Sequence, residues 1–209
     1  MEQPNVSSHD FLADKDAAWA SIKVPFTASQ CIELFRYDIE RLFRINPLYE
    51  VDEWKTHDID HCRLTGRNLS NDRAIDTKLT ISDTEGGFKI EYASGLKAST
   101  IFSVEDIPEG AKLTLTDHYP ALPPGKHQEE LGEVDKSLIP WARYLQEYLV
   151  MWKRWSWCGP WRWYMRRIWL PMKPSARRIT YMILWISLAE IIAFFMIFII
   201  FWFEMDQLF

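Results

Sequence analysis

Alternation of apolar and polar positions recurs along the first part of the chain and predicts a sheet-rich domain. The stretch 17–26 (AAWASIKVPF) alternates and is closed by its proline. Within 88–92 (FKIEY) apolar and charged residues alternate strictly, which is typical of a strand with one buried face. Turn signals such as DTEGG, ASG and PEG separate the later runs. These predicted strands span 49–55, 62–69, 75–82, 88–93, 99–107 and 112–119.

Helical spacing appears at two places around these strands. Between the first and second strands, Thr27 is a good N-cap for a helix over 28–35, and a second helix over 37–45 ends before Pro47. After a loop rich in proline and glycine, an apolar stripe recurs every three or four residues. Its members are Leu138, Trp141, Leu145, Tyr148, Leu149 and Trp152. The order predicts an α+β fold, in which a curved antiparallel sheet packs its apolar face on a long helix.

Residues 179–203 form a continuous apolar run of a different kind, with one charge in 25 residues. A helix of this length exceeds the ~30 Å hydrocarbon core of a bilayer. A chain of this size has no core that could bury such a helix on all sides. The run therefore predicts a single transmembrane helix.

Glu190 lies near the middle of that run, where an ionisable group is costly and rarely faces lipid. Ala189 and Ala193 form a small-residue pair beside it, and Ser187 precedes it by about one turn. These four residues predict a docking face for another membrane protein. The alternative is a lone protonated glutamate that the lipid tolerates.

Charge divides the chain into three zones and orients it. Residues 1–151 carry 16 Lys or Arg against 26 Asp or Glu, 152–178 carry eight basic residues and no acid, and 179–209 carry three acids and no base. Because basic flanks stay on the cytoplasmic side, the N-terminal domain is expected in the cytoplasm, with a bacterial inner membrane as the expected location. The N-terminus is polar and acidic and does not resemble a signal peptide.

The expected organisation is a polar tail (1–16), a domain (17–152), a basic juxtamembrane segment (153–178), a tail anchor (179–203) and a short acidic tail (204–209).

The stretch 152–170 (WKRWSWCGPWRWYMRRIWL) holds six tryptophans and five basic residues. Gly159 and Pro160 interrupt it, and a new amphipathic helix is predicted after them. Indoles and cations suit the headgroup zone of a membrane with anionic lipids. Single-stranded nucleic acid is the weaker interpretation, because the neighbouring domain is acidic. The residues predicted at the membrane interface are Trp161, Arg162, Trp163, Tyr164, Met165, Arg166, Arg167, Ile168 and Trp169.

The element order resembles the START/Bet v 1-like helix-grip superfamily, also called SRPBCC. The segment IKVPFTASQCIELFRYDIERLFRINP resembles its first strand and paired helices, and DKSLIPWARYLQEYL resembles the start of its C-terminal helix. The resemblance covers about residues 17–152 and excludes the apolar helix. It implies a cavity between the sheet and the long helix that holds lipids, sterols, polyketides or quinone-like molecules.

The resemblance implies a ligand cavity lined by inward-facing strand and helix residues. For each of them ordinary core packing is the alternative, because an aromatic stripe is more often core than ligand site. The candidates are Trp54, Phe88, Ile90, Tyr92, Phe102, Leu113, Leu115, Tyr119, Trp141 and Leu145.

Catalytic and metal-binding patterns are weak. The run HDIDHC at 57–62 has two histidines four apart, but it falls between two strands where a hairpin is expected. The three cysteines form no CxxC pair, and no nucleophile or phosphate-binding motif occurs. We therefore predict no catalytic residue, metal or cofactor.

Three functions fit these features. The first is a membrane-anchored binder or carrier of a hydrophobic ligand, such as a lipid, isoprenoid or quinone. The second is an accessory subunit of a membrane protein complex, such as a respiratory or other energy-converting enzyme. The third is a cyclase-like or aromatase-like enzyme, which would need polar groups that converge in the cavity.

Overall fold

The computed structural model describes residues 17–119 and 136–206, with side chains up to residue 203. The polar tail expected at 1–16 lies outside the described residues, as do the side chains of the acidic tail expected at 204–209. The chain forms two compact units, Met1–Pro171 and Met172–Phe209.

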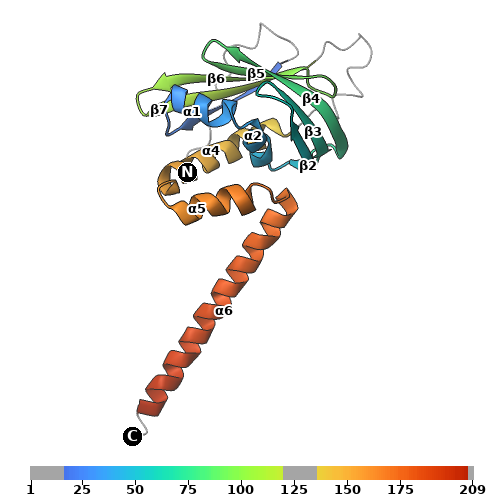
Figure 1. Ribbon diagram of the computed structural model, residues 1–209. Coiled ribbons are helices and arrows are strands. Elements are labelled where there is room, and N and C mark those ends of the chain that lie inside the picture. The colour runs from blue at the N-terminus through green and yellow to red at the C-terminus, as the bar shows by residue number, and fades with distance from the viewer. Residues whose placement is uncertain (1–16, 120–135, 207–209) are drawn as a thin grey trace. The chain divides into compact units, whose positions relative to one another are not determined.

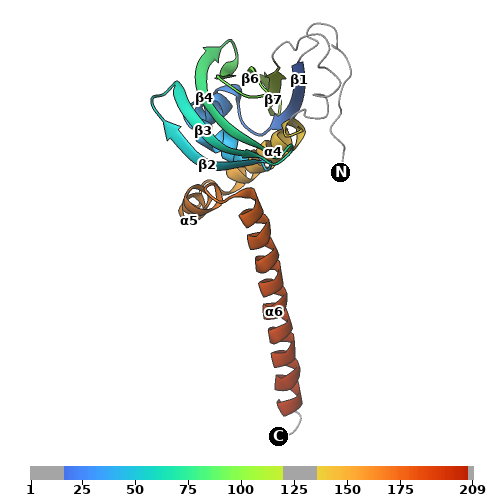
Figure 2. The ribbon, with the colours of Figure 1, turned by 90° about the vertical axis from the view of Figure 1, so that its right-hand side faces the viewer.

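Seven antiparallel strands build one curved sheet in the first unit (Figures 1 and 2). Their spatial order is β1-β7-β6-β5-β4-β3-β2, so only β1 leaves the sequential order. β1 pairs with β7 from Ala17 opposite His118 to Val24 opposite Ala111. The strands are β1 (Ala17–Val24), β2 (Tyr49–Thr56), β3 (His61–Asn68), β4 (Arg73–Thr84), β5 (Gly87–Tyr92), β6 (Ser99–Ile107) and β7 (Gly110–His118).

Two short helices, α1 (Ala28–Arg36) and α2 (Ile39–Ile45), connect β1 to β2. The predicted cap of α1 is a full capping box. The Thr27 hydroxyl accepts from the Gln30 N–H, and the Gln30 side chain accepts from the Thr27 N–H. Asp38 caps α2 in a similar way by accepting from the Arg41 N–H.

The long helix α4 (Leu138–Trp155) packs its apolar stripe against the sheet and α2 (Figure 1). Trp141 lies at the centre of this contact and is fully buried. Its ring centroid lies 5.5 Å from that of Phe43 on α2 and 5.5 Å from that of Phe102 on β6. Its indole N–H donates to the Leu42 carbonyl at 2.9 Å. The sheet wrapped around α4 confirms the predicted helix-grip α+β fold.

Three helical segments follow α4. They are α5 (Gly159–Tyr164), the π-helical turn η2 (Met165–Trp169) and α6 (Pro174–Asp206). α6 begins five residues before the predicted apolar span. Its part from residue 174 to 203 is long and apolar enough to cross a membrane, with a mean hydropathy of 2.7 over the most apolar window.

Candidate functional site

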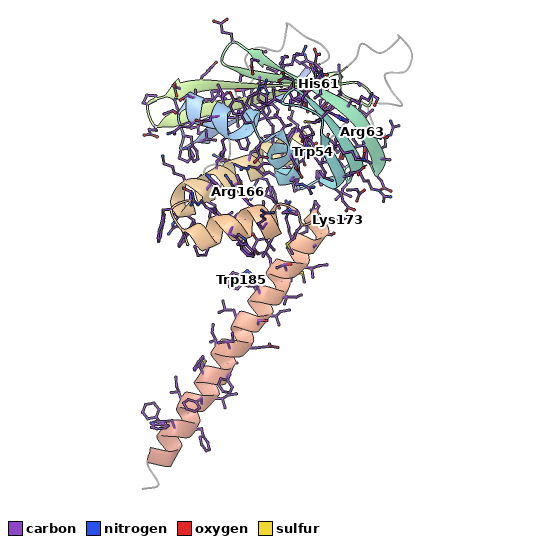
Figure 3. The ribbon with its side chains drawn as sticks, in the orientation of Figure 1. Trp54, His61, Arg63, Arg166, Lys173 and Trp185 are labelled. Atoms are coloured by element: carbon purple, nitrogen blue, oxygen red, sulfur yellow. The ribbon has the colours of Figure 1, made fainter. Side chains whose placement is uncertain are left out.

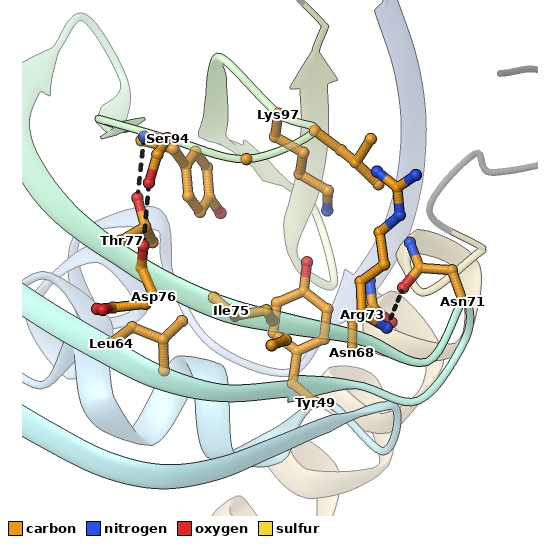
Figure 4. Close-up of a pocket in the computed structure, with 14 residues that line it drawn as sticks. Tyr49, Leu64, Asn68, Asn71, Arg73, Ile75, Asp76, Thr77, Ser94 and Lys97 are labelled. Carbon is orange, nitrogen blue, oxygen red and sulfur yellow. Dashed lines mark hydrogen bonds between the residues drawn. The ribbon is translucent and has the colours of Figure 1, made fainter.

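The first unit contains a cavity of about 530 Å³ between β2, β3, β4 and the loop that joins β5 to β6 (Figure 4). Its size falls within the ~300–1,000 Å³ that is usual for small-molecule sites. The lining residues are Tyr49, Leu64, Asn68, Asn71, Arg73, Ala74, Ile75, Asp76, Thr77, Tyr92, Ser94, Gly95, Leu96 and Lys97.

The cavity wall is mixed in character. Leu64, Ile75, Leu96 and the ring of Tyr92 supply apolar surface. The left wall in Figure 4 is tied together by hydrogen bonds, because the Ser94 N–H donates to the Thr77 hydroxyl at 3.2 Å. Such a combination suits a ligand that is apolar over most of its length and polar at one place.

A buried ion pair stands at the polar part of the wall. The Lys97 ammonium lies 2.6 Å from Oδ2 of Asp117, and their side chains are 4% and 0% exposed. The ammonium also lies 5.7 Å from the ring centroid of Tyr49 and 5.6 Å from that of Trp141. Lys97 thus faces a carboxylate and two aromatic rings at once.

Hydroxyl groups hold the carboxylate of this pair in place. The Thr100 hydroxyl donates to Oδ1 of Asp117 at 2.5 Å. Because that donation uses its only proton, Thr100 accepts from the Tyr92 hydroxyl, 3.1 Å away. The chain from Tyr92 through Thr100 to Asp117 fixes the charge that faces Lys97.

Local structure explains why these groups meet. Asp117 and Thr100 are directly paired neighbours on β7 and β6, so their side chains lie on the same face of the sheet. The loop between β5 and β6 is closed by the Tyr92 N–H, which donates to the Ala98 carbonyl at 3.0 Å. Gly95 adopts φ of +121° within that loop, a conformation that other residues rarely adopt. The turn carries Lys97 inward.

Lys97 and Asp117 were not among the residues predicted from the sequence, although one signal was present. Asp117 continues the alternating series of Leu113 and Leu115, and so occupies an inward position on β7. A carboxylate at a buried position requires a cation or several donors. That requirement indicates a cation or several hydrogen-bond donors beside Asp117, but it does not identify which residues supply them.

Ten residues were predicted to line a ligand cavity. One of them, Tyr92, lines the cavity observed here. Trp54 instead lines a smaller pocket of about 140 Å³, where its indole N–H donates to the Thr56 hydroxyl at 3.2 Å. Tyr119 lies outside the lining of the larger cavity. The other seven are at most 1% exposed and belong to the packed core: Phe88, Ile90, Phe102, Leu113, Leu115, Trp141 and Leu145.

Ring packing explains why those seven do not surround an open space. Phe88 and Phe102 stack with their ring centroids 5.0 Å apart, and Trp141 approaches Phe102 edge-on. The rings fill the region between the sheet and α4. The cavity therefore lies farther along the sheet, toward β2–β4.

The histidine-rich run forms the β2–β3 hairpin, as expected. The N–H groups of His57 and Asp58 both lie within reach of the His61 carbonyl, at 3.0 and 3.3 Å. The Asp58 carboxylate accepts from the Asp60 N–H and lies 2.9 Å from Nδ1 of His61. These contacts hold the pKa of the Asp58 carboxyl below its usual range. The hydrogen bond from the Asp60 N–H has the largest effect. The His61 side chain is exposed, and residues 17–119 and 136–203 contain no cluster of metal-ligating side chains.

The tryptophan-rich segment divides differently from the prediction. Met165 and Trp169 were expected at the membrane interface, but they are buried, at 3% and 7% exposed. Trp169 stacks on Tyr148 of α4 at 6.1 Å, and Trp161 packs against Trp152 at 5.5 Å. The end of α4 thus offers an apolar surface, which Trp161 and Trp169 of the tryptophan-rich segment cover. Burial there raises the pKa of Tyr148 to about 12.

The other face of the same segment is exposed. Trp163 is 60% exposed, and Tyr164 and Ile168 are about one-third exposed, at 36% and 37%. Arg162, Arg166 and Arg167 are exposed beside them, and the Arg166 guanidinium also lies 5.5 Å from the centroid of the Trp152 ring. Contact of these six exposed residues with lipid headgroups stays a prediction.

The predicted docking face lies on α6, whose side chains extend outward all around the helix (Figure 3). Ser187, Ala189, Glu190 and Ala193 are all exposed. Residues spaced three or four apart share one side of a helix, so Glu190 and Ala193 are neighbours there, as are Ala189 and Ala193. Within the part of the chain that the structure describes, nothing covers this face.

The sequence matches no protein-family model and no curated protein. The fold is similar to that of a protein from Thermus thermophilus, at 15% identity and a TM-score of 0.50, over 65% of this chain and 97% of that one. A START superfamily protein from Mycobacterium smegmatis matches at 15% identity and 0.48, over 65% and 98%. A Polyketide_cyc-like protein from Corynebacterium glutamicum matches at 20% identity and 0.36, over 66% and 89%. At such low identity the likeness concerns the helix-grip fold alone.

We expect substitutions at Lys97 and Asp117 to have strongly coupled effects on the free energy of unfolding. Replacing Lys97 by Met should lower the free energy of unfolding by ~3–5 kcal/mol, because Asp117 would stay buried without its cation. Replacing Asp117 by Asn as well should recover most of that loss. Urea unfolding of the solubilised chain, followed by tryptophan fluorescence, measures both. The exposed Lys55–Glu53 pair is the control, where Lys55→Met should cost at most ~1 kcal/mol. Additive losses in the double variant would contradict the coupling.

Substitutions on the two faces of the tryptophan-rich segment should differ in their effect on the free energy of unfolding. Trp169→Ala removes a buried ring and should lower the free energy of unfolding by ~3–5 kcal/mol. Trp163→Ala, at an exposed position, should change it by less than ~0.5 kcal/mol. The same unfolding measurement compares them, and equal losses would contradict the division into two faces.

Proposed function

We propose that this protein is a membrane-anchored binder or carrier of a hydrophobic ligand with one polar group, such as a lipid, isoprenoid or quinone-like molecule. The observation that carries the proposal is the cavity of about 530 Å³, whose wall combines apolar side chains with polar and charged ones. Many proteins that transport apolar molecules need such a cavity, because the ligand is poorly soluble in water.

The helix α6 supports the membrane part of this proposal. At ~1.5 Å per residue, the 30 residues from 174 to 203 extend about 45 Å, enough to cross a bilayer with some tilt. The basic residues before it favour a cytoplasmic position for the folded unit. The exposed indole and arginines of α5 and η2 would meet the headgroup zone on that side.

A second function, as an accessory subunit of a membrane protein complex, is favoured by the uncovered Glu190 face. A carboxyl group at mid-bilayer is costly in lipid, and contact with a polar group on another helix would offset that cost. The two functions are compatible, since a carrier that docks on a membrane enzyme could deliver its ligand there.

The ligand should copurify with the full-length protein. We expect extraction of the membrane fraction in mild detergent, followed by mass spectrometry, to detect a bound hydrophobic molecule. Ile75→Trp should reduce its recovery at least about fivefold, because the larger ring would occupy the cavity that Ile75 lines. Ile101→Trp is the matched control, on a strand position outside the cavity lining. Undiminished recovery with Ile75→Trp would place the ligand elsewhere, and no bound molecule in the unsubstituted protein would overturn the proposal.

The docking role of α6 has its own test. Glu190→Leu should release the partner proteins that copurify with the native chain, as seen by native gels and protein mass spectrometry. Ile191→Leu, on the neighbouring position, is the control that should keep them. If the Glu190 variant keeps its partners, the docking face is wrong.

A further inference from the structure

We propose that the cavity selects an uncharged ligand, an amphipathic molecule whose polar group is a hydroxyl or a carbonyl, and discriminates against ionised molecules such as fatty acids and organic cations. This inference rests on the proposed function, because it names the chemical class of the molecule held in the same cavity. Its basis is that each charged residue of the described wall already interacts with another group of the protein.

Lys97 is a cation of the cavity lining whose charge is already neutralised. Its ammonium lies 2.6 Å from Oδ2 of Asp117, and its nitrogen is buried. Two close opposite charges act as a dipole, whose attraction for a third charge falls more steeply with distance than that of a single ion. An anion brought against Lys97 would also approach the Asp117 carboxylate. Lys97 therefore offers a ligand no free positive charge.

The acid among the described lining residues is Asp76, and its carboxylate is paired as well. Asp76 lies on the opposite face of β4 from Ile75 and Thr77, because side chains alternate along a strand. Its side chain points away from Lys97 in Figure 4. Arg63 donates two hydrogen bonds to the carboxylate, at 2.9 and 2.8 Å, and these hold the pKa of the Asp76 carboxyl below its usual range. Asp76 therefore does not offer a counter-charge to a cation in the cavity.

Arg73 is the remaining charged residue of the described lining. It is exposed, and it too interacts with another group. Contacts between exposed charges contribute little, because water and salt screen them. Arg73 could not compensate for the loss of hydration when an ionised headgroup enters the cavity, and a charged ligand would therefore bind at a net cost.

Uncharged polar groups of the wall also form bonds within the protein. Oδ1 of Asn68 accepts from the N–H and the hydroxyl of Ser70, at 2.9 and 2.7 Å. The Ser94 hydroxyl donates to the Asp76 carbonyl at 3.0 Å. Such a wall gives a ligand few strong polar contacts, so its affinity would come mainly from burial of its apolar part. One hydroxyl or carbonyl costs far less to remove from water than an ion does.

The apolar part of the ligand has a matching surface in the cavity. Leu64, Ile75, Leu96 and the ring of Tyr92 supply it. These side chains account for the attraction of an apolar chain, whereas the paired charges account for the discrimination against an ion. The cavity therefore fits a neutral amphiphile, such as a long-chain alcohol, an isoprenol or a quinone.

The test compares three probes that share a twelve-carbon chain and differ in charge: 1-dodecanol, dodecanoate and dodecyltrimethylammonium. The full-length protein in phosphatidylcholine nanodiscs is equilibrated with each radiolabelled probe at about pH 9, where the acid is ionised and lysine keeps its proton. Label bound beyond that of empty nanodiscs is measured, and the affinity is expressed relative to the probe dissolved in the bilayer. We expect the alcohol to bind at least ~10-fold tighter than either ion, a difference of ~1.4 kcal/mol.

An unpaired charge added to the wall tests the cause of this preference. Leu96→Lys introduces a cation at a partly exposed position of the lining and should raise the affinity for dodecanoate severalfold. Ile101→Lys adds the same charge outside the lining, and Leu96→Met changes the same position without a charge. Both controls should keep the native preference. Thermal unfolding checks that each variant is folded.

The outcomes separate this inference from the proposed function. Equal binding of the alcohol and either ion by the native protein would overturn the inference and leave a hydrophobic binder. A folded Leu96→Lys variant with unchanged affinity for dodecanoate would also overturn it, because the pairing of the wall charges would not be the cause. If none of the three probes binds the native protein, the proposed function fails and the inference fails with it.

Discussion

The contact between Lys97 and Asp117 is the constraint on which much of the first unit depends. A carboxylate that is 0% exposed is tolerable only beside a cation, so the β5–β6 loop must turn inward wherever β7 places Asp117. The same contact brings Tyr49 of β2 and Trp141 of α4 against the ammonium. One charge pair thus ties together an early strand, a loop, two late strands and the long helix.

Aromatic packing decides where the rest of the fold is open. Rings from α2, β5, β6 and α4 meet around Trp141 and leave no room between the sheet and the middle of that helix. The open volume lies beside β2, β3 and β4, where more polar side chains line the wall. In this molecule the region expected to hold the ligand is the solid core, and the cavity borders it.

Alternation and helical spacing were sufficient to predict the seven strands, the helix pair and α4, because each pattern depends on neighbours along the chain. The sequence could not reveal Lys97, because its direction depends on a loop shaped by Gly95 and closed between β5 and β6. The sequence also could not show which residues of the tryptophan-rich segment are buried and which are exposed. Met165 and Trp169 would satisfy lipid or a protein surface equally well, and only the fold shows that α4 offers such a surface.

The pairing of β1 with β7 also bears on how the protein is made. The sheet cannot close at that edge until residue 118 has been synthesised, and contacts across about a hundred residues form slowly. The apolar helix begins only at Pro174, after every strand and α4. During translation, therefore, the whole sheet and its covering helix leave the ribosome before the most aggregation-prone segment does, and the first unit has the opportunity to fold before that segment needs a membrane or a chaperone.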